Sequence, residues 1–333
     1  MLKVGVLGAG SMGSTHARNF AKLPDVQVVG VSSQSVEKAT ALAKEVGGEP
    51  FTDAMALATD PQVDAVSVTL PNYLHKDYAV AALNAGKHVL VEKPMGLTVE
   101  ECDAMIEAAH RNSRLLMVAH VPRFWPEYVA VADCVHSGQL GRPLAATASR
   151  LSEPPAWGSW FANPAWTGGA VHDLQIHDLD IFNWLFGSPQ SVYARGQRGT
   201  AGGWDHVLAV IGYAGVQTFA EGSWLMPVGY PFTFTLSVLC EKGLVEFTSR
   251  AVDTRAETGT TFSASLMVYE SGQAPRPLPS PGGDGYQNEL ATFVKCIREG
   301  RSPDQCTAEQ GRLAVQTALA VRQSLDTSQV VSL

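Results

Sequence analysis

The chain has 333 residues, more than one ordinary domain needs, so we expect two domains. Hydrophobic residues make up 45% and charged residues 17%, which excludes a disordered protein and indicates a well-buried globular one. The net charge of -8 offers no basic surface to nucleic acid or to an anionic membrane, so we expect neither as a partner.

The start of the chain and its cysteines both favour the cytoplasm. Residues 1–6 form an apolar run of strand length, without the basic start and long apolar stretch of a secretory signal. No apolar segment approaches the roughly 18 residues of a membrane span. The five cysteines are odd in number and include no CxxC pair, which indicates buried reduced thiols rather than disulfides or a zinc site.

Short apolar segments alternate with helical patterns through the first 120 residues. Strands are predicted at 3–7, 26–32, 65–69, 88–91 and 115–119, and helices at 16–22, 36–46, 74–85 and 99–111. Strands that are apolar on both faces and separated by helices predict a parallel sheet covered on both sides. Residues 1–120 are therefore predicted to form an α/β, doubly wound Rossmann domain that binds a dinucleotide.

The pattern changes after Arg123. Helices are predicted at 126–137, at about 171–186, and near the end of the chain at 286–299 and 307–325. Between residues 232 and 238 apolar residues alternate with Thr and Ser, and a Glu241-Lys242-Gly243 turn leads into another apolar run, which predicts an antiparallel hairpin. Residues 121–333 are therefore predicted to form an α+β domain built on an open, mostly antiparallel sheet.

A glycine-rich loop follows the first predicted strand and precedes the first predicted helix. Gly8, Gly10 and Gly13 stand in a GxGxxG pattern whose glycines allow a tight turn, a close approach of backbone to a pyrophosphate and close packing of helix on strand. Because strand, loop and helix occur in the expected order, we predict a dinucleotide site that also includes Ser11 and Met12.

The end of the second predicted strand bears on the choice of cofactor. A carboxylate at this place binds the ribose hydroxyls of NAD and repels the 2′-phosphate of NADP, but the chain has Ser33 there. Ser33 can donate to a phosphate oxygen, and Lys38 can supply a positive charge from the next helix. We therefore expect NADP to be preferred, with NAD possible, and Lys38 as a solvated surface residue is the alternative.

Two further motifs contain residue types suited to acid-base chemistry. Lys93 follows the predicted strand 88–91, at the edge where open α/β sheets bind ligands, and is expected to face the nicotinamide. Asp173 and His177 are four residues apart in a predicted helix and share one face with Asp180. A carboxylate, an imidazole and an ammonium around one hydroxyl can couple proton transfer to hydride transfer, so Lys93, Asp173 and His177 are the predicted catalytic residues.

The chain resembles the glucose-fructose oxidoreductase, inositol dehydrogenase and rhizopine-catabolism (Gfo/Idh/MocA) family in four motifs, which lie at residues 8–13, 71–75, 92–94 and 169–180. The resemblance implies acid-base roles for Lys93 and His177, and a role for Asp173 in orienting substrate or histidine. It also implies that the cofactor is lined by Pro71, Asn72, His75, Glu92 and Lys93. The implied activity is oxidation or reduction of a secondary hydroxyl or keto group of a sugar, a cyclitol or a derivative.

The chain departs from the family pattern in the last motif. It has Gly168-Gly169-Ala170 where three glycines are common, and Gln175-Ile176 before His177 where Gly-Val is common. These departures leave the identity of the substrate open.

Several residues have a competing interpretation. His172 and Asp178 lie roughly 100° off the face of their neighbours in a helix, so we expect no metal site. His75 either contacts the cofactor or bonds within a buried turn. The indole rings of Trp157, Trp160 and Trp166 suit either a sugar ring or a subunit interface. Arg123, Trp125 and Tyr128 either line a cleft between the domains, where the substrate is expected to bind, or pack internally.

The expected assembly is a homodimer or homotetramer formed through the open face of the second-domain sheet, as in the family that the chain resembles. Phe232, Phe234 and Leu236 mark one apolar strand face, which either forms this interface or covers the helices of its own domain. The alternative function is a sensor of the same fold that binds NAD(P) without catalysis. Sensing needs only the glycine-rich loop at residues 8–13, here called the phosphate loop. The joint presence of Lys93, Asp173 and His177 therefore favours an enzyme.

Overall fold

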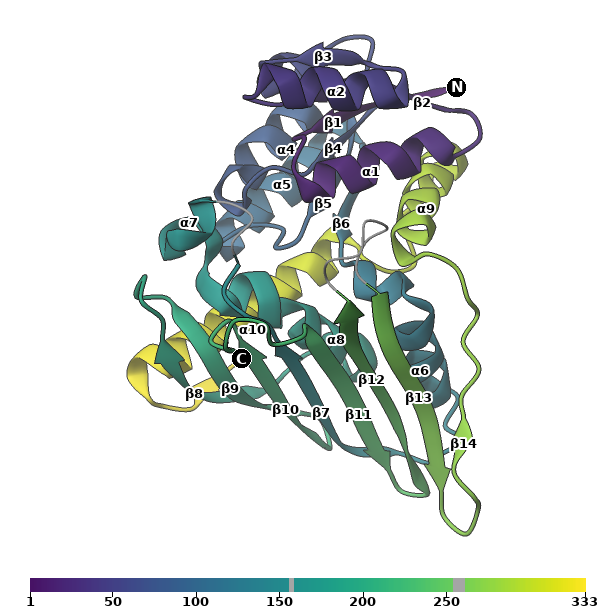
Figure 1. Cartoon of the computed structure of the whole chain (residues 1–333), viewed down its shortest axis with the longest axis vertical. Coiled ribbons are helices and arrows are strands. Elements are labelled where there is room, and N and C mark those ends of the chain that lie inside the picture. The colour runs from purple at the N-terminus through teal and green to yellow at the C-terminus, as the bar shows by residue number, and fades with distance from the viewer. Residues whose placement is uncertain (156–158, 254–260) are drawn as a thin grey trace. The chain divides into compact units, whose positions relative to one another are not determined.

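The computed structural model describes residues 1–155, 159–253 and 261–333, which divide into two units (Figure 1). The first unit comprises Met1–Phe124 and Gly283–Arg312, and the second comprises Trp125–Gly282 and Leu313–Leu333. This division differs from the expected domains 1–120 and 121–333 because residues 283–312 return to the first unit.

A six-stranded parallel sheet in the order β3-β2-β1-β4-β5-β6 forms the first unit. Its strands are β1 (Leu2–Leu7), β2 (Val26–Ser32), β3 (Glu49–Phe51), β4 (Ala65–Val68), β5 (His88–Glu92) and β6 (Leu116–Ala119). The helices that follow these strands are α1 (Ser11–Lys22), α2 (Val36–Val46), α3 (Ala54–Thr59), α4 (His75–Asn84) and α5 (Val99–Asn112). The predicted doubly wound α/β fold is confirmed, although the sequence pattern did not reveal the short β3 and α3.

Helices cover both faces of this sheet, which explains why β4 and β6 are buried at every position. On one face, α1 and α2 pack over β1 and β2 in a single apolar core. The late helix α9 (Gly285–Glu299) joins the same core through Leu290, Phe293 and Val294, and it contacts α1. This apolar stripe on α9 is the physical reason why residues 283–312 belong to the first unit.

A nine-stranded sheet in the order β14-β13-β12-β11-β7-β10-β9-β8-β15 forms the second unit. Its strands are β7 (Pro143–Leu151), β8 (Ser191–Arg198), β9 (Trp204–Tyr213), β10 (Val216–Ser223), β11 (Thr233–Cys240), β12 (Gly243–Asp253), β13 (Thr261–Glu270), β14 (Arg276–Pro277) and β15 (Val331–Ser332). All neighbouring strands are antiparallel except β7 and β10, which are parallel. The predicted open, mostly antiparallel sheet is confirmed.

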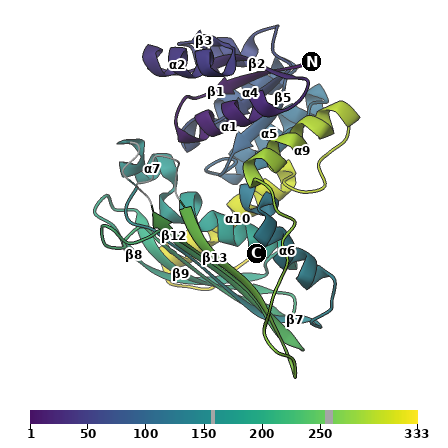
Figure 2. The ribbon, with the colours of Figure 1, turned by 45° about the vertical axis from the view of Figure 1, so that its right-hand side comes forward.

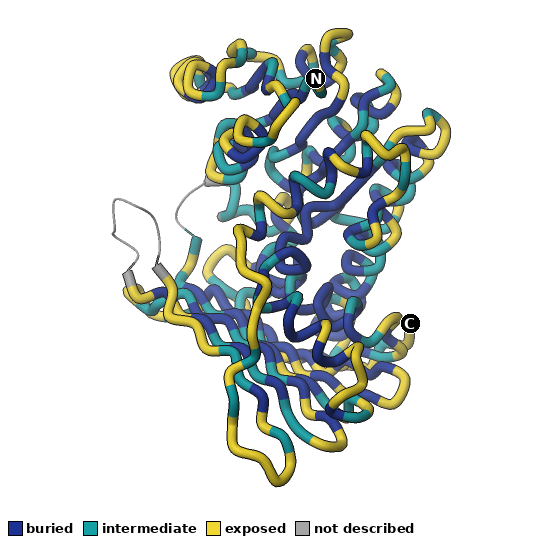
Figure 3. Tube along the Cα trace, turned by 90° about the vertical axis from the view of Figure 1, so that its right-hand side faces the viewer, coloured by how far each residue is buried: buried dark blue, intermediate teal, exposed yellow. Residues whose placement is uncertain are grey.

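Helices of the second unit pack on one face of this sheet (Figures 1 and 2). They include α6 (Pro126–His136), which contacts β12, and α8 (Ile176–Phe186), which contacts β7 and β10. The helix α10 (Ala308–Thr327) begins in the first unit and continues into the second. Figure 3 shows buried residues along the strands of both sheets, as expected where apolar side chains face helices.

The predicted hairpin is present, because β11 and β12 pair antiparallel across the two-residue turn Glu241-Lys242. Phe234 and Leu236 of β11 are buried, and the ring of Phe234 lies 5.4 Å from that of Trp125 and 6.4 Å from that of Tyr128. This apolar face of β11 therefore covers helices of its own unit. The interpretation of the same face as a subunit interface is wrong, because alternation along β11 turns these side chains toward α6.

Two properties of the whole chain complete the fold. All five cysteines are buried with free thiols. Among the described residues, no helix combines the length and apolar character needed to cross a membrane.

Candidate active site

The phosphate loop joins the end of β1 to the start of α1, at the carboxyl edge of the parallel sheet. Gly8 has a φ of +113°, and a Cβ atom there would lie 2.7 Å from the carbonyl oxygen of Thr69. A Cβ atom on Gly13 would overlap the carbonyl oxygen of Gly8, so helix and strand meet only because Gly13 has no side chain.

The open side of this loop fits a pyrophosphate. Gly10 is exposed at the N-cap of α1, no side chain caps the helix there, and nothing lies within 4 Å of a Cβ atom built on it. Ser11 is exposed and Met12 is half-buried in the first turn of the helix. The backbone N–H groups of this turn are therefore accessible to an anion, and the helix dipole favours negative charge at the same place.

Beyond the end of β2, a positive charge (Lys38) and a negative charge (Glu37) both lie close in sequence to Ser33. The Ser33 hydroxyl oxygen accepts a hydrogen bond from the Ser35 backbone N–H, at 3.2 Å, and its own proton stays available for another acceptor. Lys38 is exposed in the first turn of α2, and its backbone N–H is capped by Ser35. Ser35 also donates to the carboxylate of Glu37, and this bond lowers the pKa of Glu37. Glu37 lies one helical turn beyond the residue that follows β2, so the position of that residue alone does not predict this acid.

The segment after β4 is held inside the protein. Asn72 is buried in a short 3₁₀ helix, Asn72–Leu74, and Pro71 is half-buried. His75 is fully buried, with Nδ1 2.8 Å from the carbonyl oxygen of Pro94 and Nε2 2.8 Å from that of Leu70. Burial lowers the pKa of His75 and outweighs its hydrogen bonds. Its side chain presents no surface to a ligand, so the geometry matches the internal-bond interpretation rather than a cofactor contact.

Lys93 is accessible in an otherwise buried segment. Residues 89–96 are all buried except Lys93, which is half-buried just after β5. The preceding Glu92 is buried, and its Oε2 accepts a hydrogen bond from the Lys93 backbone N–H at 3.1 Å. The Glu92 side chain is thus directed into the protein. His75, Thr69 and Gly8 bring the loops after β1, β4 and β5 together.

The second unit shows the same pattern. From residue 169 to residue 183 every position is buried except Asp173 and His177. The predicted α-helix over 171–186 begins instead with a π-helical turn, Val171–Gln175, before α8. Such turns are rare and frequently occur at functional sites. The structure therefore places Asp173 and His177 together at the only accessible positions of this segment, whereas Asp180 is fully buried.

Gln175 lies inside this turn. Its Nε2 donates to the carbonyl oxygen of Ala220 at 3.1 Å, and a Cβ atom on Gly222 would lie only 2.9 Å from the Gln175 Cβ atom. A side chain at position 175 thus requires a glycine on β10, a pairing that the sequence pattern alone could not reveal.

A buried ion pair holds the start of α8. Arg150 of β7 donates through Nε and Nη2 to the two carboxylate oxygens of Asp178, at 3.1 and 2.9 Å, and Nη2 also donates to the Tyr128 hydroxyl at 3.0 Å. Burial alone would lower the pKa of Arg150, but the charge of Asp178 raises it. Asp178 is therefore committed to Arg150, and His172 is fully buried. Among the described residues, no group of three or more His, Cys, Asp or Glu side chains is arranged to hold a metal.

The remaining predicted substrate contacts divide by exposure. Trp166 is 42% exposed just before the end of α7 (Pro164–Thr167), and Trp160 is half-buried against Phe161, with ring centroids 4.0 Å apart. Arg123 is buried in a 3₁₀ helix, Val121–Phe124, so its side chain offers little surface to a substrate. Trp125 and Tyr128 pack against Phe234, as the internal-packing alternative states. Trp157 lies outside the described residues.

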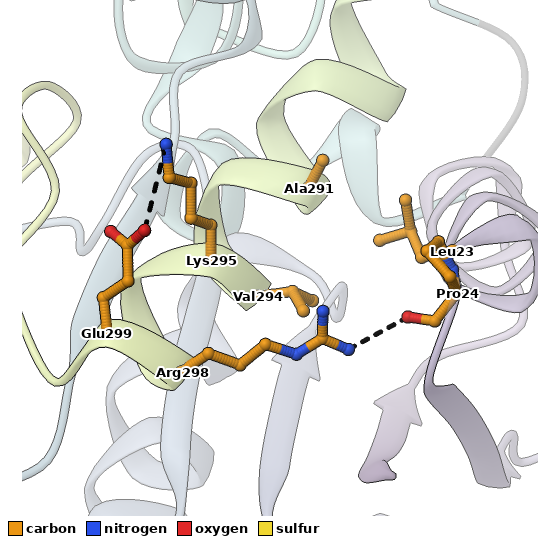
Figure 4. A pocket seen from close by; sticks show the side chains of 7 residues that line it. All are labelled: Leu23, Pro24, Ala291, Val294, Lys295, Arg298 and Glu299. Atoms are coloured by element: carbon orange, nitrogen blue, oxygen red, sulfur yellow. Dashed lines mark hydrogen bonds and ion pairs between the residues drawn. The ribbon is translucent and has the colours of Figure 1, made fainter.

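A surface pocket of about 330 Å³ in the first unit lies apart from these residues (Figure 4). It is lined by Leu23 and Pro24 beyond the C-terminal end of α1 and by side chains of α9, and Arg298 donates to the Pro24 carbonyl oxygen at 2.9 Å. The phosphate loop is at the opposite end of α1. This pocket is therefore separate from the candidate dinucleotide site.

Comparisons with known proteins agree with the folds of the two units. Residues 2–120 match the family described as "Oxidoreductase family, NAD-binding Rossmann fold", and residues 128–246 match the "GFO/IDH/MocA C-terminal domain". The chain is 27% identical over 345 residues to a 1,5-anhydro-D-fructose reductase of Ensifer adhaerens, covering 100% of this chain and 99% of that protein. It is 26% identical over 348 residues to a myo-inositol 2-dehydrogenase of Thermotoga maritima, covering 100% and 98%.

Among solved structures, the chain is similar to an aldose-aldose oxidoreductase from Caulobacter crescentus, with a TM-score of 0.85 and 24% sequence identity. The similarity covers 100% of this chain and 99% of that structure, so the two share one fold along their whole length.

Proposed function

Because this chain belongs to the glucose-fructose oxidoreductase, inositol dehydrogenase and rhizopine-catabolism family, we propose that it is an NAD(P)-dependent oxidoreductase that interconverts a secondary hydroxyl and a keto group of a sugar, a cyclitol or a derivative. One observation carries this proposal. In two motif segments that are otherwise buried, the accessible residues are Lys93 in the first unit and Asp173 and His177 in the second. These are the acid-base residue types that the reaction needs.

The first unit holds the cofactor in this proposal. The backbone of residues 8–13 and the N-terminus of α1 bind the pyrophosphate, and Pro71, Asn72 and Lys93 lie in the neighbouring loops at the carboxyl edge of the sheet. The order of strands reverses at β1 and β4, which is where open α/β sheets bind ligands. When bound, the nicotinamide supplies the acceptor or donor of hydride.

The proton is handled by side chains of the chain itself. In the oxidative direction the substrate hydroxyl must lose a proton, and we assign His177 as the base because imidazoles ordinarily titrate near neutral pH. The Lys93 ammonium donates a hydrogen bond to the same oxygen and stabilises the negative charge that develops there. Asp173, the other accessible residue of the π-helical segment, orients the substrate or the imidazole.

The names of the relatives support a polyhydroxylated ring as substrate, since one acts on an anhydro sugar and another on myo-inositol. Trp166 is exposed in the same unit as Asp173 and His177, and an indole face suits the C–H face of such a ring. Trp160 is a weaker candidate because Phe161 covers part of it.

We propose NADP as the preferred cofactor, with NAD as an alternative. The Ser33 hydroxyl can donate to a 2′-phosphate, and Lys38 supplies a nearby positive charge. Glu37 opposes this preference, because its carboxylate repels the same phosphate. Measuring the dissociation constants of NADPH and NADH shows whether the positive charge of Lys38 or the negative charge of Glu37 has the larger effect.

We propose a homodimer or homotetramer that associates through the open face of the nine-stranded sheet. Tyr193, Val210 and Phe219 lie side by side on β8, β9 and β10 and are exposed, as is Leu208 on β9. A contiguous apolar row on a sheet is typical of a protein interface. Phe219→Asp should therefore lower the mass measured by light scattering, and a monomeric mass of the unmodified protein would refute the proposal.

The five buried free thiols support a reducing compartment, so we propose the cytoplasm as the place of action. Fractionation of cells that express the tagged protein tests this assignment.

The proposed reaction is tested with the purified chain and both reduced and oxidised cofactors. The fluorescence of reduced nicotinamide is followed on mixing with inositols, aldoses, anhydro sugars and keto sugars. Turnover of at least one compound is expected. Tight cofactor binding without turnover of any of them favours the non-catalytic sensor instead.

A further inference from the structure

We propose that His16 is a positioning residue for Lys93, acting through the buried carboxylate of Glu92. This inference rests on the proposed function, because Lys93 matters only if it acts on the substrate. His16 belongs to none of the motifs singled out in the sequence, and it lies on the helix that follows the phosphate loop.

His16 connects three elements of the first unit. It is fully buried in α1, with Nδ1 2.8 Å from the Ser67 hydroxyl oxygen of β4 and Nε2 3.1 Å from Oε1 of Glu92 at the end of β5. One imidazole therefore ties α1 to two neighbouring strands at the edge of the sheet that carries the candidate site.

Glu92 takes part in this contact as a carboxylate. Burial alone would raise the pKa of Glu92, but its contact with His16 and the charge of Lys93 lower it below its usual value. The buried carboxyl group of Glu289 on α9 also faces Glu92, and burial and the charge of Glu92 raise the pKa of Glu289 well above its usual value, which favours its neutral form. Because a carboxylate only accepts hydrogen bonds, a proton on Nε2 of His16 suits its 3.1 Å contact with Oε1 of Glu92, although the contact is electrostatic and not a well-aligned hydrogen bond. In that tautomer the Ser67 hydroxyl can donate to Nδ1.

The carboxylate transmits this contact to Lys93. Oε2 of Glu92 accepts the backbone N–H of Lys93 at 3.1 Å, while the carbonyl oxygen of Pro94 on the other side is held by His75 at 2.8 Å. The backbone of Lys93 is thus held on both sides, by the side chain of Glu92 and by the anchored carbonyl group of Pro94. A lysine side chain is long and flexible, so the place of its backbone determines which positions the ammonium can reach.

The consequence is a mechanical link between cofactor and lysine. The N-terminus of α1 is the candidate pyrophosphate site, and His16 extends from the same helix to the Glu92 carboxylate. One rigid helix therefore determines the position of the cofactor and also that of Lys93, the residue proposed to assist the reaction.

Two amide variants separate this role from simple packing. In His16→Gln the amide nitrogen can reach the place of Nε2 and donate to Glu92, whereas the shorter amide of His16→Asn can reach only the Ser67 side. Both variants remove the same ring and its edge contact with Phe20. We expect His16→Asn to lower kcat by roughly 10- to 100-fold, as displacement of a positioned group does, and His16→Gln to stay within a few-fold of the unmodified enzyme.

The dissociation constant of the dinucleotide should change by less than about three-fold in both variants, because the backbone of the phosphate loop is unaltered. Equal losses of kcat in the two variants, or no loss in either, would overturn the positioning role. Glu92→Gln is a second route if His16 variants fold poorly: it keeps the shape but replaces one of the two acceptor oxygens by an amide donor, so the side chain can no longer accept from both the imidazole and the Lys93 backbone N–H. It should reproduce the loss seen with His16→Asn.

Lys93→Ala in the same series separates failure of the positioning role of His16 from failure of the proposed role of Lys93. If Lys93→Ala keeps near-normal turnover, the proposed function of Lys93 has failed. If Lys93→Ala abolishes turnover while His16→Asn and Glu92→Gln both turn over normally, the role of Lys93 stands and the positioning role of His16 has failed.

Discussion

Replacing Arg150 by methionine should destabilise the second unit, because it leaves the carboxylate of Asp178 buried without its partner. The side chains of Arg150 and Asp178 are only 3% and 1% exposed, and two hydrogen bonds at 2.9 and 3.1 Å join them. Removing one member of such a buried pair costs roughly 3–5 kcal/mol of unfolding free energy. Methionine fills much of the same volume, so the loss reports the unpaired charge rather than a cavity.

The pH dependence of this loss has a definite sign. Burial raises the pKa of Asp178, and without Arg150 nothing opposes that effect. In the variant, the carboxyl group of Asp178 then has a higher pKa in the folded state than in the unfolded state. The folded state therefore binds the proton more tightly, and lowering the pH stabilises it relative to the unfolded state. The deficit in stability relative to the unmodified protein should be largest at neutral pH and should shrink in mildly acidic buffer.

Urea unfolding followed by tryptophan fluorescence measures the effect, since Trp125 lies near Tyr128 and Phe234 in the same unit. Arg142→Met is the matched control, because Arg142 also pairs with a carboxylate, that of Glu241, but is 81% exposed. The control should lose much less stability. A loss for Arg150→Met no larger than that of the control, or equal at both pH values, would refute the reasoning.

Lys93→Ala and His177→Ala should each lower kcat by roughly 100- to 10,000-fold in steady-state assays while the cofactor dissociation constant stays within a few-fold, and near-normal turnover in both would contradict their assignment. Gly10→Ala should weaken dinucleotide binding in a fluorescence titration without lowering Tm, because its Cβ atom meets only open space, whereas Gly13→Ala should lower both, because its Cβ atom overlaps the Gly8 carbonyl oxygen. Ser33→Asp should shift the ratio of dissociation constants toward NADH, and an unmodified protein that already favours NADH would contradict the NADP preference.

The proposed catalytic residues could be chosen from the sequence because they follow recognisable local patterns. Lys93 stands just after an apolar strand, and Asp173 and His177 recur at helical spacing. The structure added that these positions are accessible in otherwise buried segments. Exposure of single residues in a buried segment depends on what packs around them, which a local pattern does not contain.

His16, Arg150 and Glu37 were not found from the sequence. Each acts through a partner or a neighbour that periodicity does not mark: His16 through Glu92, which is 76 positions away, Arg150 through Asp178, and Glu37 through the cap of α2. A buried charge is tolerated only when a partner from another element reaches it, and that pairing is decided by the tertiary fold.

The sequence by itself determined the two fold classes, because apolar runs between helices and alternating strands depend on local periodicity. Only the tertiary structure decided that residues 283–312 belong with the first unit and that Phe234 and Leu236 face α6 rather than another subunit. An apolar stripe on a helix or strand specifies that the side chains are buried, but not against which partner. That choice is made by the whole chain, through the packing of surfaces that are distant in sequence.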